Sequence, residues 1–212
     1  MARQLQGSRF EAVWKRNTVT GAAGSDISEQ LLKSYSENGR YYHTCGHISF
    51  CLSVFDQASN LCLNPDAVEV ALWFHDAVFN FPINENERLS AEYFMRVSES
   101  VMPDSFRERV YGLVMATRHL APPTDPDEQI MVDIDLSSFG QAWEFFNADG
   151  QNVRRELSYL GDGEYFPNQI EFMSKLVERP YFYNTPWFRE HFEAQARDNV
   201  ERYLRDLREK GY

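Results

Sequence analysis

The sequence predicts an all-α protein, and three of its features carry that prediction. Apolar residues recur at helical spacing along most of the chain. Residues that begin and end helices, such as Asn-Pro and Asn-Gly pairs, stand between these segments. No series of alternating strands joined by hairpin turns occurs. We therefore expect helices around one buried core and no sheet of consequence.

Length and composition suit one globular domain over residues 1–212. Hydrophobic residues make up 43% of the chain and aromatic residues 15%, which is enough for a substantial core. We find no internal repeat and no linker that would divide the sequence. Residues 1–30 are expected to form an N-terminal helical extension of this domain.

Helix boundaries are visible in the first half of the chain. Phe10 and Trp14 lie on one face of the first expected helix. The second helix is expected to end at the Asn-Gly pair 38–39. A long helical segment is then predicted from residue 41 to about residue 60. Asn64, followed by proline, is expected to open the next helix.

The second half follows the same pattern. Residues 80–87 are expected to form a loop, and the proline-rich segment 121–128 a break between helices. Residues 129–139 alternate like a strand, but their helical surroundings favour a helix. The other helices are expected at 87–99, from Pro103, at 141–158, at 167–178 and at 187–209.

The charge balance excludes some partners. Lys and Arg number 21 and Asp and Glu 32, so the formal net charge is −11. Duplex nucleic acid and anionic membranes both attract clustered cations, so we expect neither as a partner. A small phosphorylated substrate is compatible with this charge when a metal ion and a few arginines neutralise it.

We expect a cytoplasmic location. The apolar stretches are far shorter than the roughly 20 residues that span a bilayer, and residues 1–16 contain no apolar run typical of a secretory signal. The three cysteines, Cys45, Cys51 and Cys62, form no C-x-x-C pair. An odd number without such a pair favours reduced thiols.

Histidines and aspartates occur at positions that suit a metal site. His43 and His47 are four residues apart and would share a face if both were helical. His75 and Asp76 stand together near the end of an apolar helix. Imidazoles combined with carboxylates suit Mn, Fe, Zn or Mg, with positions left for water and substrate.

Two further aspartates, Asp133 and Asp135, lie in the apolar run IMVDIDLSSF. A buried carboxylate is costly unless it meets a cation or strong donors. Each of these features by itself also fits a structural role, such as a hydrogen-bonded core histidine or an aspartate paired with arginine. Their combination favours a shared metal ion.

Several strings resemble one known family when they are taken together. In chain order they are RYYHTCGHI (40–48), ALWFHDAVF (71–79), ENERLSA (85–91), ATRH (116–119) and DIDLSSFG (133–140). These resemble the motifs of predicted bacterial-type metal-dependent phosphohydrolases of the HD superfamily. The likeness spans about residues 31–207, and it implies an HD-domain, phosphodiesterase-like helical bundle. The chain departs from the pattern at Glu85, where aspartate is usual, and at Ile134, where alanine is usual.

The resemblance also implies a ligand set and roles for single residues. By a local likeness to cyclic-nucleotide phosphodiesterases, His43 would protonate the leaving oxygen, and Asp76 would accept a proton from the attacking water. The match favours Asp135 over Asp133 as a ligand, with the reverse if the register slips. The cofactor would be a divalent ion: Mn, Mg, Fe, Co or Zn. Its ligands would be His47, His75, Asp76 and Asp135.

Four residues are predicted on the substrate side of the site. Arg40 and Arg118 adjoin the motifs and would hold phosphate oxygens by bidentate pairing. His119 ends the string ATRH, and Glu87 would support a ligand histidine. The alternatives are surface salt bridges for the arginines and a stabilising first-turn carboxylate for Glu87. Arg88 and Arg154 are weaker candidates.

The function that follows is metal-dependent hydrolysis of a phosphate ester in a small molecule, such as a nucleotide. The alternative is a catalytically silent HD-fold module that binds a nucleotide or regulates another protein. An oxygen-using iron enzyme is a third option, and it is disfavoured because few histidines lie between His75 and the late aspartates.

Overall fold

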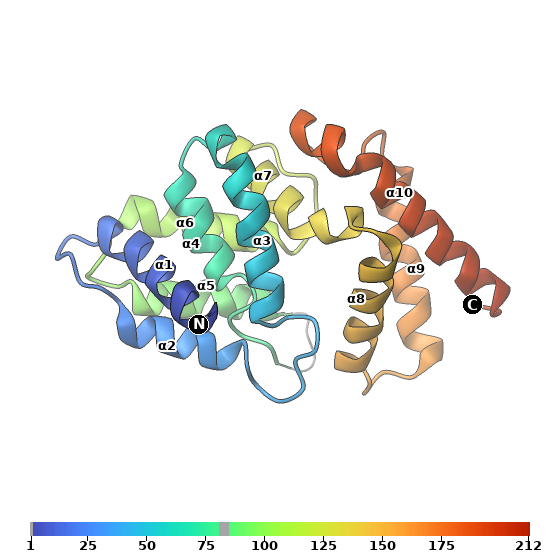
Figure 1. The fold of residues 1–212 in the computed structure, drawn as a ribbon, viewed down its shortest axis with the longest axis horizontal. Coiled ribbons are helices and arrows are strands. Elements are labelled where there is room, and N and C mark those ends of the chain that lie inside the picture. Colours follow the sequence, from blue (N-terminus) through green and yellow to red (C-terminus); the bar gives the residue numbers. More distant parts are fainter. Residues whose placement is uncertain (1, 81–84) are drawn as a thin grey trace. The chain divides into compact units, whose positions relative to one another are not determined.

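A computed structural model describes residues 2–80 and 85–212, with side chains from residue 7 onward, and in these ranges it consists of helices joined by turns and loops (Figure 1). The all-α prediction is confirmed. No strand occurs in the described ranges, and none of their helices has the length and apolar character needed to cross a membrane. The α-helices are α1 (Ala2–Asn17), α2 (Ser25–Ser34), α3 (Cys45–Ala58), α4 (Pro65–Phe74), α5 (Asn86–Val97), α6 (Asp104–Ala116), α7 (Pro126–Asp135), α8 (Trp143–Glu156), α9 (Asp162–Glu178) and α10 (Pro186–Glu209), with short 3-10 helices η1 (Ser59–Leu61) and η3 (Leu136–Gly140).

The described residues form two compact units. Unit 1 consists of the chain up to Asn38 together with His43–Val132, and unit 2 consists of Gly39–Tyr42 together with Asp133–Tyr212. Helix α7 contributes to both, because its last three residues belong to unit 2. The single-domain organisation expected from the sequence stays a prediction.

Aromatic side chains from three helices form the core of unit 1. Phe10 and Trp14 of α1 have ring centroids 5.4 Å apart, and Phe10 contacts Trp73 of α4 edge-on at 5.6 Å. Phe74 of α4 lies 5.1 Å from Phe94 of α5. Because all five rings are buried, the N-terminal helix is part of this core and is held there by apolar contact.

The turn between α1 and α2 depends on a glycine. Gly24 has a φ of +69°, which side chains rarely allow, and a Cβ there would lie 2.5 Å from a ring atom of Trp14. Both the backbone conformation and the close approach therefore require glycine.

Two predicted boundaries differ from the structure. Helix α2 ends at Ser34 rather than near residue 38, and the hydroxyl of the following Tyr35 donates to the Trp73 carbonyl at 2.9 Å. Helix α9 begins at Asp162, five residues before its expected start, with acidic residues in its first turn. Such carboxylates stabilise a helix N-terminus. The loop predicted at 80–87 lies partly outside the described residues.

Two other expectations are confirmed. Helix α4 begins with Pro65 after Asn64, whose side chain accepts from the Ala67 amide at 3.1 Å. The strand-like run 129–139 is helical, first as α7 and then as η3. The start of α7 is tied into unit 1 because the buried Asp127 accepts from the Leu63 amide at 2.7 Å.

Unit 2 is built around the contact of η3 with α10. The side-chain amide of Asn199 donates to the carbonyls of Phe139 and Gln141, both at 2.7 Å. A Cβ at Gly140 would lie 2.7 Å from the Cβ of Phe192, so only glycine allows this approach. The residues directly after the late aspartates are therefore held in place by the C-terminal helix.

Candidate metal centre

His47 lies near the N-terminus of helix α3. The backbone of Thr44 is extended, and its hydroxyl accepts from the Gly46 amide at 3.2 Å, which caps the helix before Cys45. His47 lies in the first turn and is 6% exposed. His43 precedes the cap, so the expectation that His43 and His47 share a helical face is wrong. The cap residue Thr44 stops the helix short of His43.

His75 directly follows α4 as its C-cap residue and is 1% exposed. Its Nδ1 lies 2.9 Å from the Leu72 carbonyl oxygen. A carbonyl can only accept, so Nδ1 carries the proton and donates. In the neutral ring Nε2 then carries a lone pair, which is the form of histidine that binds a metal ion.

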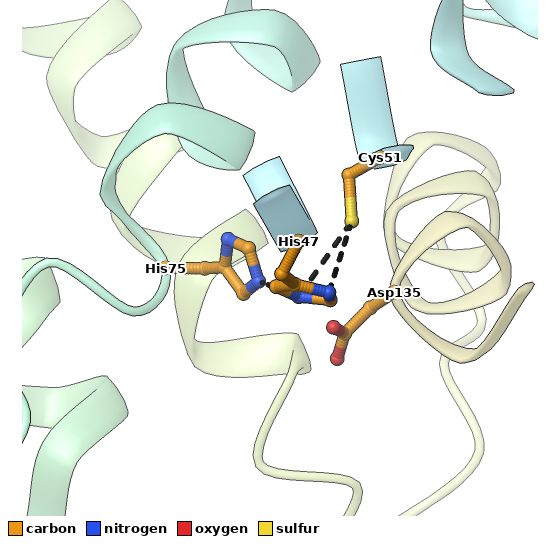
Figure 2. A group of neighbouring side chains, drawn as sticks. All are labelled: His47, Cys51, His75 and Asp135. Atoms are coloured by element: carbon orange, nitrogen blue, oxygen red, sulfur yellow. Dashed lines mark hydrogen bonds between the residues drawn. The ribbon is translucent and has the colours of Figure 1, made fainter. Parts of the chain in front are cut away.

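Two further candidate ligand atoms lie beside this nitrogen. His75 Nε2 lies 3.2 Å from His47 Nε2 and 3.0 Å from an Asp76 carboxylate oxygen, and His47 Nε2 lies 3.5 Å from the same oxygen. Figure 2 shows the two imidazole rings turned toward each other, His47 from α3 and His75 from the end of α4. The structure thus brings together three of the four predicted metal ligands.

The cluster offers acceptor atoms to a cation. His75 Nε2 and the Asp76 oxygen carry lone pairs, and His47 Nε2 carries one in one of the two tautomers of its neutral ring. Burial by itself raises the pKa of Asp76, but attraction to His75, His43 and His47 outweighs it and holds that pKa below its usual range. A proton or a metal ion between these atoms relieves the repulsion.

The spacing also suits a metal ion. A circle through the three atoms, with separations of 3.2, 3.0 and 3.5 Å, has a radius of about 1.9 Å. Metal bonds to imidazole nitrogen and carboxylate oxygen are about 2.1 Å long. A point at bonding distance from all three atoms therefore exists, and the residues present fit a divalent ion.

Sequence reasoning missed Cys51 as a member of this cluster. Cys51 is fully buried on α3, and its Sγ lies 3.6 Å from His47 Nε2 and 3.8 Å from His47 Nδ1 (Figure 2). The ligand atoms of His47, Cys51 and His75 all lie within 4.8 Å of one another. A signal was present in the sequence, because Cys51 follows His47 by four residues and so shares its helical face.

The two late aspartates differ sharply in their surroundings. One oxygen of Asp133 accepts from the amide and side-chain nitrogens of Asn184, at 2.8 and 2.9 Å. The other accepts from the amide and hydroxyl of Thr185, both at 2.8 Å. Burial raises the pKa of Asp133 to about 6, although these hydrogen bonds lower it. Asp133 is thus engaged in structure, while Asp135 is the last residue of α7, belongs to unit 2 and stays a predicted ligand.

His43 lies next to the three-atom cluster but is not part of it. Its ring centroid is 6.1 Å from that of His47 and 4.9 Å from that of Phe79. His43 therefore stands beside His47, with its ring packed on that of Phe79.

The predicted substrate-side residues occupy varied positions. Arg118 and His119 follow the end of α6, and His119 has a φ of +53°, which non-glycine residues rarely adopt. Glu87 lies in the first turn of α5, where a carboxylate stabilises the helix. Arg40 is buried and belongs to unit 2.

The two weaker arginine candidates serve structural roles. Arg88 forms ion pairs with Glu85 and Glu92 on the exposed side of α5. Arg154 donates to the carbonyls of Leu157 and Leu160, at 2.8 and 3.0 Å, where α8 gives way to α9. The expectation that they hold phosphate is not supported by these contacts.

Comparison of the chain with protein-family models, with curated proteins and with solved structures finds no match.

Proposed function

We propose that this chain is a metal-dependent phosphohydrolase that cleaves a phosphate ester of a small molecule, such as a nucleotide. One observation carries the proposal: His47, His75 and Asp76 hold three lone-pair atoms 3.0 to 3.5 Å apart in a largely buried place. Side chains so arranged suit an ion of Mn, Mg, Fe, Co or Zn. The motif resemblance assigns phosphate ester hydrolysis to such a site.

Asp135 is proposed as the fourth ligand. The motif resemblance names it beside His47, His75 and Asp76. Of the two candidate aspartates, Asp133 already directs both oxygens to four donors. Asp135 is the last residue of α7, and the motif resemblance favours it as the ligand.

The chemistry divides between the ion and the side chains. A divalent ion, when bound, activates water as a nucleophile and polarises a phosphoryl oxygen. Asp76, whose pKa is held low, stays ionised and accepts a proton from the attacking water. His43 supplies a proton to the leaving oxygen, a task suited to imidazole near neutral pH. Arg40, Arg118 and His119 are proposed to bind the remaining phosphate oxygens, and Glu87 to support the ligand cluster.

The first test is turnover. The purified chain with Mn²⁺, Co²⁺ or Mg²⁺ is expected to release phosphate or nucleoside from a panel of nucleotides and model esters. His75→Ala and Asp76→Ala should abolish both this activity and stoichiometric metal binding, because each removes a proposed ligand. Metal content is measured by elemental analysis.

The matched control is His191→Ala. His191 is exposed and stacks on Trp187 in unit 2, so its loss should leave metal content and turnover unchanged. Full activity in both ligand variants would exclude this site as the catalytic one. Tight nucleotide binding without any product over many hours would instead favour the catalytically silent module.

A second test separates proton transfer from metal binding. His43→Gln is expected to lower kcat by about 10²- to 10⁴-fold, the usual contribution of a positioned general acid. Metal content should stay at the wild-type level, because His43 is outside the ligand cluster. A variant with unchanged kcat, or one that loses its metal, would refute the role assigned to His43.

A further inference from the structure

We infer that Cys51 is a ligand of the proposed metal ion and that its sulfur makes the site select thiophilic ions such as Zn²⁺ and Co²⁺ over Mg²⁺ and Mn²⁺. The inference rests on the proposed metal centre and adds to it a soft ligand. Neither the motif strings nor the resemblance assigns Cys51 any role.

The position of the sulfur supports this role. Cys51 Sγ lies 3.6 Å from His47 Nε2. Bonds of about 2.3 Å to sulfur and 2.1 Å to nitrogen, meeting at a tetrahedral angle, separate two such atoms by about 3.6 Å. Sγ is also slightly nearer to Nε2 than to His47 Nδ1, which is 3.8 Å away, so it lies closer to the nitrogen that belongs to the three-atom cluster.

The surroundings of Cys51 favour ligation as well. The residue is fully buried, one helical turn after His47, and its Sγ lies within 4.8 Å of the ligand atom of His75. The other two cysteines, Cys45 and Cys62, are partly exposed and outside this group. On ligation the thiol of Cys51 releases its proton to solvent, and the resulting thiolate binds the cation.

A thiolate changes which ions the site prefers. Soft sulfur ligands bind Zn²⁺ and similar ions strongly, whereas carboxylate and water suit Mg²⁺ and Mn²⁺. With His47, His75 and Asp76 alone, the site would discriminate weakly among divalent ions. Adding Cys51 gives a mixed nitrogen, oxygen and sulfur ligand set, which prefers Zn²⁺ and Co²⁺ to Mg²⁺ and Mn²⁺.

The experiment uses Co²⁺ as a spectroscopic probe of the full-length chain. Wild-type protein loaded with Co²⁺ is expected to show a thiolate-to-cobalt charge-transfer band in the near ultraviolet together with visible ligand-field bands. Cys51→Ser should lose the charge-transfer band and keep the visible bands. It should also bind Zn²⁺ at least about tenfold more weakly, since even supporting residues of metal sites cost that much, with Mn²⁺ affinity unchanged.

Matched controls are Cys45→Ser and Cys62→Ser, which should keep the charge-transfer band. Cys51→Ala is a second variant, and circular dichroism shows that each variant is folded before it is loaded. Wild-type protein that binds Co²⁺ without a charge-transfer band would overturn the role of Cys51 and leave the metal centre standing. Wild-type protein that binds no divalent ion would overturn the metal centre and this inference together.

Discussion

Two aspartates, Asp133 in unit 2 and Asp76 in unit 1, meet the cost of burial in opposite ways. Asp133 accepts four hydrogen bonds from Asn184 and Thr185, so its charge is balanced by donors of the chain itself. Asp76 instead lies against ring nitrogens of His47 and His75, at 3.5 and 3.0 Å. The first carboxylate is satisfied by the chain itself, and we propose that the second is completed by a cation.

The contrast separates stability from function. A carboxylate that is satisfied by backbone and side-chain donors contributes to the folded state whatever is in solution. On the proposed function, a carboxylate that is grouped with imidazoles contributes through the ion that it binds. In sequence the two positions are alike, because both are acids in or directly after apolar helical segments, and only their partners distinguish them.

The largest expected effect on stability comes from Asp133→Ala. Its removal leaves the Asn184 and Thr185 donors without their acceptor, so we expect a loss of about 3 kcal/mol in the free energy of unfolding. Chemical denaturation in the presence of a chelator measures this loss. Asp198→Ala, an exposed site on α10, should change the free energy by no more than about 0.5 kcal/mol.

The contrast between Asp133 and Asp76 would be contradicted if Asp133→Ala lowered the free energy of unfolding only when metal is present. Asp133 would then act through the ion, like Asp76, and the register of the two late aspartates would have to be reversed. A loss of the same size with and without chelator is the outcome that the hydrogen bonds predict.

The next effect is the stability that the ion itself supplies. At a free metal concentration 100 times its Kd, binding to the folded state alone adds about 2.7 kcal/mol. We expect a rise in Tm on adding Zn²⁺ or Co²⁺, reversed by a chelator, in thermal denaturation followed by circular dichroism. His75→Ala should show no such rise, and an equal rise in that variant would mean that the ion binds elsewhere.

The smallest effect belongs to an exposed ion pair, which is a third environment for an aspartate. Burial alone would raise the pKa of Asp66, but hydrogen bonds from Arg16 and Asn17 lower it. The folded pKa is thus below the unfolded one, so this stabilisation is present above about pH 4 and is lost as pH falls through the folded pKa.

Because Arg16 and Asp66 are partly exposed, solvent screening limits the contribution to less than about 1 kcal/mol. Asp66→Asn should therefore be slightly less stable than wild type at pH 7, with the difference shrinking below pH 4. Denaturant titrations across this pH range measure it. A difference that grows on acidification would contradict the assigned sign.

Much of the fold and part of the site could be predicted from local sequence. Helical spacing and the Asn-Pro start of α4 depend on neighbouring residues only, so these predictions are confirmed. The placement of His43 on α3 was wrong, because spacing alone does not reveal that Thr44 caps the helix between the two histidines. Cys51 was missed because an apolar, buried cysteine looks like any core residue until its neighbours are known.

The sequence by itself determined an all-helical chain in which His47 and the pair His75-Asp76 are candidate ligands, because helix formation and residue chemistry are local properties. Only the tertiary structure decided that these side chains approach within 3.5 Å and that Cys51 joins them. The tertiary structure also decided that Asp133 accepts its hydrogen bonds from Asn184 and Thr185. Distances between residues far apart in the chain depend on how helices pack, and packing is set by the whole core rather than by any one segment.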